Sequence, residues 1–407
     1  MHNKTDYSSP VPMIPGSPVF NCGRTGVLAR WSTCIFFLFV LLFSTPAYAL
    51  DLTDSFSGCY KALGAVTKST SSKEDIYYAL QRVRLEFEPK LTKNIELNLT
   101  YDHELILNDF SNTPDFDLIR QRDQKHSTWF DADQVISDTK HVNEKQLLHR
   151  AFIKFESDHS RLTFGKQLID WGRMRFYSPL DLFNPPIPSN VEADERVGFD
   201  ALNIEFSSDN FSGINLLYGP NTTEATSSYG LRFYKKIATY DTFLLAAKHE
   251  KDRIVGIGFD GYIKDAGFRG EFSYTRSGKE KYARVSIGAD YSLSPKATVL
   301  MEYFYNGAAN GGYDAFANSI FVQSQQLTLK KHLLSQMITY EITPLFKFRW
   351  LSIYDIVGKS AFLNPELRYN IKENLDIAVG SQLFIKSLGS EFQNSNNIYY
   401  AELKLFF

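Results

Sequence analysis

Apolar and polar side chains alternate along most of the chain, and this two-residue period constrains the fold more than any other feature. In the segment 95–102, the odd positions are apolar and the even positions are polar or charged. Successive side chains of an extended strand point to opposite faces, so each such segment predicts a strand with one apolar and one polar face. The pattern recurs at 82–88, 150–156, 202–206, 268–274, 283–291, 346–350, 366–371 and 375–379.

Charge and loop length indicate what these two-faced strands build. The polar faces carry charges of both signs, as a water-filled lumen would, and the connections divide into tight turns and long loops. Short turns at one end and long loops at the other are typical of transmembrane β-barrels. A soluble antiparallel sandwich, in which the apolar faces meet in a core, is the alternative. The tight turns fall near 88–93, 157–160, 207–210, 292–295 and 370–374, and the long loops near 108–146, 169–197 and 307–327.

Composition excludes several other classes of protein. No run of about 18 apolar residues occurs after the N-terminal segment, which argues against a helical membrane protein. The formal net charge of −2 lacks the basic excess of a nucleic-acid surface, so no nucleic-acid partner is expected. Three cysteines cannot build a disulfide scaffold. No metal-binding, nucleotide-binding or hydrolase motif is found, so we expect no catalytic residue, no metal and no cofactor.

The alternating segments number eighteen, which predicts an all-β, antiparallel up-and-down barrel. An even count is what a closed single-chain barrel needs, and a barrel of this size encloses an aqueous channel. Sixteen strands stay open as an alternative, because 328–341 alternates poorly and Pro365 interrupts a strand. The predicted strands are 58–66, 76–88, 94–107, 147–157, 161–168, 199–207, 212–219, 228–236, 241–250, 253–262, 266–276, 281–291, 296–306, 328–341, 345–356, 361–371, 374–385 and 397–407.

The first 49 residues are typical of an export signal. Arg24 and Arg30 precede an apolar stretch at 34–43 that is too short to span a bilayer, and Ala47-Tyr48-Ala49 matches a signal-peptidase site. We therefore expect an N-terminal extension and cleaved signal at 1–49 and a barrel at 50–407. Met13 is an alternative start. The short stretch before the first strand also predicts that no plug domain precedes the barrel.

The final strand carries an assembly signal. Tyr399, Leu403, Leu405 and Phe407 share one face, and the chain ends on the phenylalanine. This pattern resembles the C-terminal signal of Gram-negative outer-membrane proteins. The resemblance implies that the barrel-assembly machinery, outer-membrane lipids and lipopolysaccharide are partners, and that the protein resides in the outer membrane of a Gram-negative bacterium.

The segment 165–186 breaks the alternation. Its Gly165-Lys166-Gln167 and Trp171-Gly172 resemble a signature of uncharacterised porin-like and alginate-export-like barrels, which implies an outer-membrane channel without naming a solute. The glycines suit close backbone approach or an unusual φ. Trp171, Phe176 and Tyr177 suit the aromatic girdle at the outer interface.

Charged residues of this loop and of the strands are the candidate pore residues. The loop at 169–197 either folds inward and sets selectivity or packs on the rim. Acids and bases on the strands either pair with each other, which we expect, or form a basic wall that favours anions. The candidates are Asp170, Trp171, Arg173, Arg175, Asp181 and Arg196 in the loop, and Arg82, Arg84, Glu86, Arg269, Glu271 and Arg284 on the strands.

These patterns favour an outer-membrane channel for passive diffusion of small polar solutes. Export of an anionic polysaccharide is the alternative, and a continuous basic wall along the lumen would favour it. A barrel-mounted enzyme, with a catalytic pair at the rim, is the third hypothesis. The oligomeric state does not follow from the sequence.

Overall fold

The computed structural model describes residues 55–69, 74–108, 129, 132–139, 141–186, 188–189, 191, 196, 198–208, 210–221, 226–309 and 328–407. The export signal predicted at 1–49 lies outside these residues, as does most of the predicted loop 307–327. The boundary between signal and barrel at residue 49 therefore stays a prediction.

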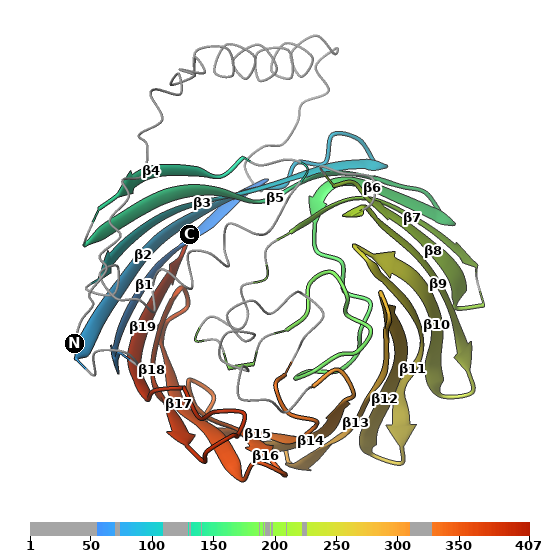
Figure 1. Ribbon diagram of the computed structural model, residues 1–407. Helices are drawn as coiled ribbons and strands as arrows, with labels where there is room; N and C mark the ends of the chain where they lie inside the picture. The colour runs from blue at the N-terminus through green and yellow to red at the C-terminus, as the bar shows by residue number, and fades with distance from the viewer. Residues whose placement is uncertain are drawn as a thin grey trace, which may run out of the picture. The chain divides into compact units, whose positions relative to one another are not determined.

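The described residues form a single closed antiparallel sheet, seen as a ring of strands in Figure 1. Apart from β4, each strand pairs with the next strand of the ring in chain order, and β19 pairs with β1 to close the ring. The strands are β1 (Phe56–Lys68), β2 (Asp75–Phe87), β3 (Ile95–Asn108), β4 (Gln134–Asp138), β5 (Val142–Glu156), β6 (Ser160–Gln167), β7 (Phe199–Ser208), β8 (Ser212–Gly219), β9 (Ser228–Ile237), β10 (Tyr240–His249), β11 (Asp252–Ile263), β12 (Ala266–Ser277), β13 (Glu280–Ser294), β14 (Ala297–Asn306), β15 (His332–Thr343), β16 (Phe346–Asp355), β17 (Ser360–Lys372), β18 (Leu375–Ile385) and β19 (Ile398–Phe406).

Eighteen of these nineteen strands make the ring, which confirms the larger of the two predicted counts. β3 pairs directly with β5, and the short β4 pairs only with the first residues of β5. β4 falls inside the predicted loop 108–146, and β5 begins five residues earlier than expected. The sequence did not reveal β4 because Val135 and Ile136 are adjacent and both exposed, so no alternation marks the strand.

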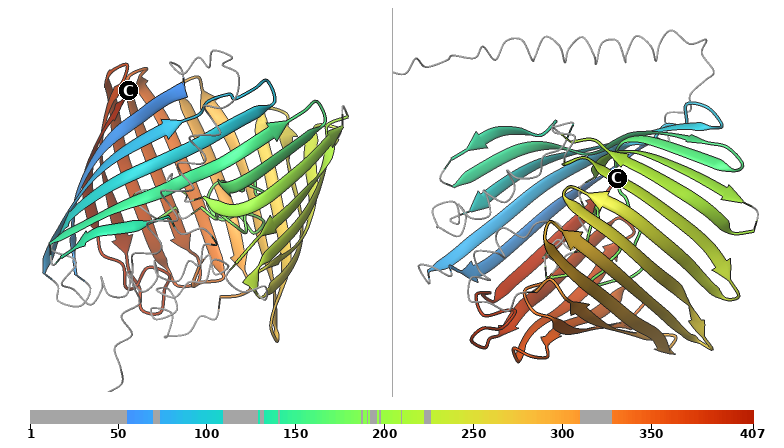
Figure 2. Two further views of the ribbon diagram at one scale, coloured as in Figure 1. Left: turned by 90° about the horizontal axis from the view of Figure 1, so that it is seen from above. Right: turned by 45° about the vertical axis from the view of Figure 1, so that its right-hand side comes forward.

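The outer face of the sheet exposes apolar side chains and the inner face buries charged ones, the reverse of the arrangement in a soluble protein. Ile257 on β11 is 51% exposed, whereas Glu271 on the neighbouring β12 is 3% exposed. Apolar side chains therefore cover the outside, and charged side chains line the inside, as the barrel prediction required; the sandwich alternative is wrong. Figure 2 shows the wall from the side. The exposed apolar side chains include Val83, Leu85, Ile153, Phe155, Phe206, Leu231, Phe272, Tyr274, Ile287, Tyr291, Leu367, Tyr369 and Val379.

No helix among the described residues is both long and apolar enough to cross a membrane.

Pro365 leaves only a local defect in the wall. The β17–β18 ladder skips from the pair Leu363–Leu383 to the pair Glu366–Gly380. Proline has no N–H to donate. The Asn364 amide instead donates to the Ser381 carbonyl at 3.0 Å, so a side chain replaces the missing backbone donor. The strand therefore survives the interruption that the sequence suggested.

The last strand closes the barrel through its final residue. The backbone N–H and C=O of Phe407 both bond to Gly58, at 3.0 and 2.8 Å. Tyr399, Leu405 and Phe407 are exposed on the outer face, and Leu403 is partly exposed. The shared face of the C-terminal signal is therefore present, while recognition by the assembly machinery stays a prediction.

We predict that Ile257→Arg destabilises the barrel by about 2–4 kcal/mol in phospholipid vesicles, because it places a cation at mid-height on the lipid face. Ile263→Arg lies on the same strand and face but at the turn end, and should cost only about 0–1 kcal/mol. Urea unfolding of the vesicle-embedded protein measures both values. Equal, small effects would show that the apolar face does not meet lipid.

Candidate functional site

The loop 168–198 connects β6 and β7, and its described residues, 168–186, 188–189, 191, 196 and 198, lie inside the ring of strands, in green in Figure 1. Ile169, Trp171 and Leu180 are each at most 2% exposed. Of the two alternatives for this loop, the structure therefore has the inward one, and the rim alternative is wrong. Its position makes the loop the candidate constriction of the lumen.

Two carboxylates of the barrel wall hold the loop by its backbone. Glu302 on β14 accepts the N–H of Arg175 at 2.8 Å and that of Phe176 at 2.9 Å. Glu271 on β12 accepts the N–H of Arg173, and also the Ser178 hydroxyl at 2.7 Å. Two further N–H groups, those of Met174 and Leu180, bond to the same carboxylate at 3.3 and 3.2 Å.

These hydrogen bonds satisfy backbone N–H groups of the loop that would otherwise be buried without a partner. Its backbone has no strand partner, and a buried unpaired N–H costs as much as a lost hydrogen bond. Hydrogen bonds to a carboxylate are stronger than those between neutral groups. Glu271 was predicted as a pore-lining charge; it is instead buried between wall and loop, where it positions the loop.

Aromatic rings fill the space between the loop and the wall. The rings of Trp171 and Phe183 meet edge to face, with their centres 5.3 Å apart. Tyr177 stacks on Phe304 of β14, with the ring centres 5.1 Å apart. The predicted place of Trp171, Phe176 and Tyr177 in the outer aromatic girdle is therefore wrong: all three are buried in the lumen. Their wall partners are inward-facing apolar residues, namely Leu217, Leu245, Ile254, Leu300, Leu333, Leu351 and Ile353.

Glycines permit this close packing, as the sequence suggested for Gly165. Its φ is +124°, a conformation that side chains other than hydrogen rarely adopt. On the wall, a Cβ on Gly230 would collide with the Trp171 ring, and one on Gly256 would collide with Leu180. These two wall glycines were not identified from the sequence, because their role depends on where the loop lies.

An ion pair between the partly exposed Arg196 and the buried Asp181 fixes the far end of the loop. Arg196 donates to Asp181 at 3.0 Å and to the Asn184 carbonyl at 3.1 Å, and reaches Asp170 at 3.5 Å. Burial raises the pKa of Asp181 well above its usual value; the nearby charge of Asp170 adds to the shift, and Arg196 opposes it. Asp181 and Arg196, predicted as pore charges, thus stabilise the loop from within.

Arg173 and Arg175 differ from their buried neighbours, because their side chains are exposed while their backbone N–H groups bond to the wall. Arg232 of β9 is within electrostatic reach of Arg173, and its guanidinium lies 4.8 Å from the centre of the Phe243 ring. Arg173, Arg175 and Arg232 form what we call the arginine cluster of the constriction. Arg232 was not singled out from the sequence.

The other predicted wall residues are paired. Arg82 meets Glu104 at 2.5 Å and Arg84 meets Asp102 at 2.6 Å. Arg269 pairs with Asp290, and Arg284 bonds to the Asn306 side chain at 3.0 Å. Glu86 accepts the Ser57 hydroxyl at 3.2 Å near the turn end, away from the loop. The expected pairing of wall charges is therefore confirmed for Arg82, Arg84 and Arg269.

A second loop, 386–397, is held in a similar way. Glu391 accepts the N–H of Leu329 at 2.9 Å and that of Lys330 at 2.7 Å. Burial raises the pKa of Glu391 to about 7, and the neighbouring Asp355 carboxylate contributes to the rise. Phe392 packs in the same apolar cluster as Tyr177, so the two loops support each other. Among the residues described, no group of three potential ligands could hold a metal ion.

We predict that Glu302→Ala releases the loop. The substitution removes the acceptor of two backbone N–H groups, at about 1.5–3 kcal/mol for each bond to a charged group. The variant should show higher and noisier single-channel conductance and faster proteolysis within 168–198. Glu205→Gln is the matched control, because Glu205 accepts the Tyr234 hydroxyl and does not touch the loop. Wild-type conductance in Glu302→Ala would contradict the anchoring role.

We also predict that the packing of Glu391 against residues 329–330 opens more easily as pH rises, because burying the ionised carboxylate costs more than its two hydrogen bonds return. The pKa of Glu391 is about 7 in the folded protein and 4.5 in the usual case. Its contribution to the stability of this packing is therefore fully present below pH 4.5 and is lost as pH rises through 7. Hydrogen exchange at the amides of Leu329 and Lys330, corrected for its intrinsic rate, should show more protection at about pH 5 than at about pH 8. In Glu391→Gln this difference should vanish; its persistence would assign the effect to another group.

Comparison with known proteins supports the fold. No protein-family model matches the sequence, and no curated protein matches it. Among solved structures, OccAB3 of Acinetobacter baumannii is similar at 11% identity and a TM-score of 0.52, over 86% of this chain and 98% of that one. The outer membrane protein OpdK of Pseudomonas aeruginosa is similar at 10% identity and a TM-score of 0.54, over 86% and 98% of the two chains. OpdK solved with vanillate gives 8% identity and a TM-score of 0.52, over 87% and 99%.

At such low identity these similarities establish the fold alone. Together with the closed ring and the apolar outer face, they confirm the predicted architecture. The chain is a porin-like β-barrel, with the fold of Gram-negative outer-membrane proteins.

Proposed function

We propose that the protein is a passive channel for small polar solutes, narrowed by the loop 168–198. One observation carries this proposal: the loop is fixed inside an eighteen-strand barrel by Glu271 and Glu302. Barrels of this size enclose water, and an inward loop reduces the size of the solutes that pass. A fixed loop suits a channel that discriminates by size and charge without an energised gate.

The charge at the constriction favours anions. Arg173 and Arg175 have exposed side chains, and the wall residue Arg232 adds a third positive charge within electrostatic reach of Arg173. Three of the nearby acids are buried away from the lumen: Glu271 and Glu302 lie under the loop backbone, and Asp181 is paired with Arg196. Asp170 and Glu205 also act on Arg232; Asp170 is shared with Arg196 at 3.5 Å, and Glu205 accepts the Tyr234 hydroxyl. Rings of basic side chains are how anion-selective pores discriminate.

Export of an anionic polysaccharide is not favoured, because it would need a basic wall along the whole lumen. Away from the constriction, wall cations pair with wall acids. Lys61 meets Glu402 at 3.0 Å, and Arg349 meets Glu366 at 3.0 Å. Such pairs neutralise the wall where a long polyanion would have to slide.

We propose further that the barrel is not an enzyme. The arrangement nearest to a catalytic pair is the Ser228 hydroxyl, 2.9 Å from Nδ1 of His249. Both residues are buried, and the rings of Phe183 and Phe199 lie against the histidine at 5.2 and 6.1 Å. A substrate could not reach this hydroxyl without displacing the packed rings.

The test is planar-bilayer recording of the refolded protein in a salt gradient. We expect discrete conductance with anion preference in the wild type, and a several-fold lower anion-to-cation permeability ratio in Arg173→Gln/Arg175→Gln. Lys235→Gln/Lys296→Gln removes two charges at the turn end and should leave the ratio unchanged. Silence in all salts would refute the channel. A wild-type ratio in the arginine variant would refute selection at the loop.

A further inference from the structure

Four basic residues form a row across four neighbouring strands at the end of the barrel that carries the long loops. Lys248 on β10 pairs in register with Arg253 on β11, Arg253 with Arg276 on β12, and Arg276 with Lys281 on β13. Arg253 lies between the buried Asp252 and Ile254 and therefore points outward, toward the membrane. The other three are in register with it and share its face of the sheet. We call them the basic row.

The basic row lies beside the two tight connections that join these strands. Lys251 and Lys279 lie in those connections and add positive charge, while Glu250 and Glu280 are the acids next to them. The same end of the barrel carries the loop 168–198, and in outer-membrane barrels the long loops face the outside of the cell. The basic row is therefore level with the headgroups of the outer leaflet.

Within the part of the chain that the structure describes, no carboxylate forms an ion pair with Arg253, Arg276 or Lys281. The ion pairs of the barrel lie at other places, chiefly on the inner wall. Lys248 donates to the Ser227 carbonyl at 2.9 Å and lies 5.5 Å from the centre of the Tyr229 ring. A single cation at this level costs only about 0–1 kcal/mol. Like charges in register on adjacent strands repel each other, however, so an anion lying between them would stabilise the row.

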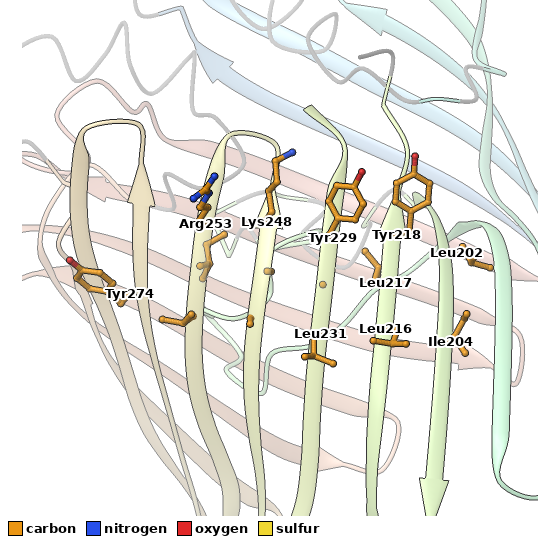
Figure 3. A pocket seen from close by; sticks show the side chains of 15 residues that line it. Leu202, Ile204, Leu216, Leu217, Tyr218, Tyr229, Leu231, Lys248, Arg253 and Tyr274 are labelled. Carbon is orange, nitrogen blue, oxygen red and sulfur yellow. The ribbon is translucent and has the colours of Figure 1, made fainter. Parts of the chain in front are cut away.

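An apolar groove of about 670 Å³ continues from the basic row toward the middle of the membrane. Figure 3 shows Lys248 and Arg253 at one end of it, with Tyr218 and Tyr229 beside them. Ala246 forms a low point, because it pairs with Leu231 on one side and Val255 on the other. The groove is thus cationic at the headgroup level and apolar below.

We propose that this surface binds lipopolysaccharide, with the phosphates of the glycolipid on the basic row and an acyl chain in the groove. Two features support this ligand. Its negative phosphates complement the basic row, and the row lies at the headgroup level with the apolar groove below it, in the same order as the phosphates and acyl chains of the glycolipid. Arginine forks match phosphate geometry with paired hydrogen bonds. Four strands about 4.8 Å apart spread the charges over roughly 14 Å, enough for a headgroup with more than one phosphate. A neutral lipid would give Arg253, Arg276 and Lys281 no counter-charge.

The first test measures binding of lipid A to the whole barrel in phosphatidylcholine nanodiscs. Arg253→Gln/Arg276→Gln/Lys281→Gln should weaken binding roughly 100-fold, since each basic residue near a charged membrane surface contributes about fivefold. Lys235→Gln/Lys264→Gln/Lys296→Gln removes three cations from the turn end and should bind like the wild type. Retained heat-modifiable migration and channel conductance will show that both variants are folded.

The lipid forms distinguish the sources of the phosphate. Dephosphorylated lipid A should bind the wild type as weakly as lipid A binds the triple variant. Inorganic phosphate at millimolar concentration should not displace lipid A, because it lacks the chain that fills the groove. If inorganic phosphate did displace lipid A, the basic row would be a site for a free anion and the proposal of a lipid ligand would be wrong. Unchanged lipid A binding in the triple variant would refute the proposal. If the triple variant also lost an oligomer of the wild type, the basic row would be an interface between copies of the chain instead.

Filling the groove gives an independent test. Ala246→Phe adds an apolar ring on the lipid face, which the barrel tolerates, and occupies the low point between Leu231 and Val255. The variant should bind lipid A several-fold more weakly, yet bind a water-soluble phosphorylated headgroup without acyl chains like the wild type. Equal binding of lipid A by both proteins would show that no chain lies in the groove.

Discussion

Every backbone polar group inside a membrane must find its hydrogen bond within the protein, and the rest of this structure depends on that requirement. It excludes an open sheet edge, so β19 pairs with β1 and the chain closes on its own first strand. Even a defect must be repaired: at Pro365 the Asn364 side chain bonds to the carbonyl that proline leaves without a donor. Closure in turn creates an enclosed interior, which is where the functional loop lies.

The same requirement explains how an irregular segment can occupy that interior. The loop 168–198 cannot join the sheet, so wall carboxylates accept its N–H groups in place of strand partners. The loop presents its rings to apolar patches of the wall and its two exposed arginines to the lumen. One arrangement thereby fixes the loop and sets the charge of the constriction. Burying these carboxylates costs free energy, but their hydrogen bonds fix the loop and thereby the shape of the lumen.

The outer surface divides its chemistry by height. At mid-height the wall exposes apolar side chains such as Ile257 and Val255, as hydrocarbon demands. Two residues further along the strand from Val255, Arg253 belongs to the basic row, where water and headgroups begin. The inner wall shows the opposite order, with its charges paired across neighbouring strands. Charge inside the barrel is therefore balanced by the protein, whereas for the basic row outside we propose a counter-charge from the lipid.

The sequence alone located the eighteen wall strands and the side of the sheet that meets lipid, because side-chain direction in a strand depends only on odd or even position. It left a count of sixteen open and did not reveal β4, which the structure decided. It also determined which end carries the long loops. Only the tertiary structure decided that Trp171 is buried in the lumen, that Glu271 holds a backbone, and that Arg232 lies near Arg173. These contacts join segments that are tens of residues apart across a space that exists only after the ring has closed, and no local pattern of residues records that distance.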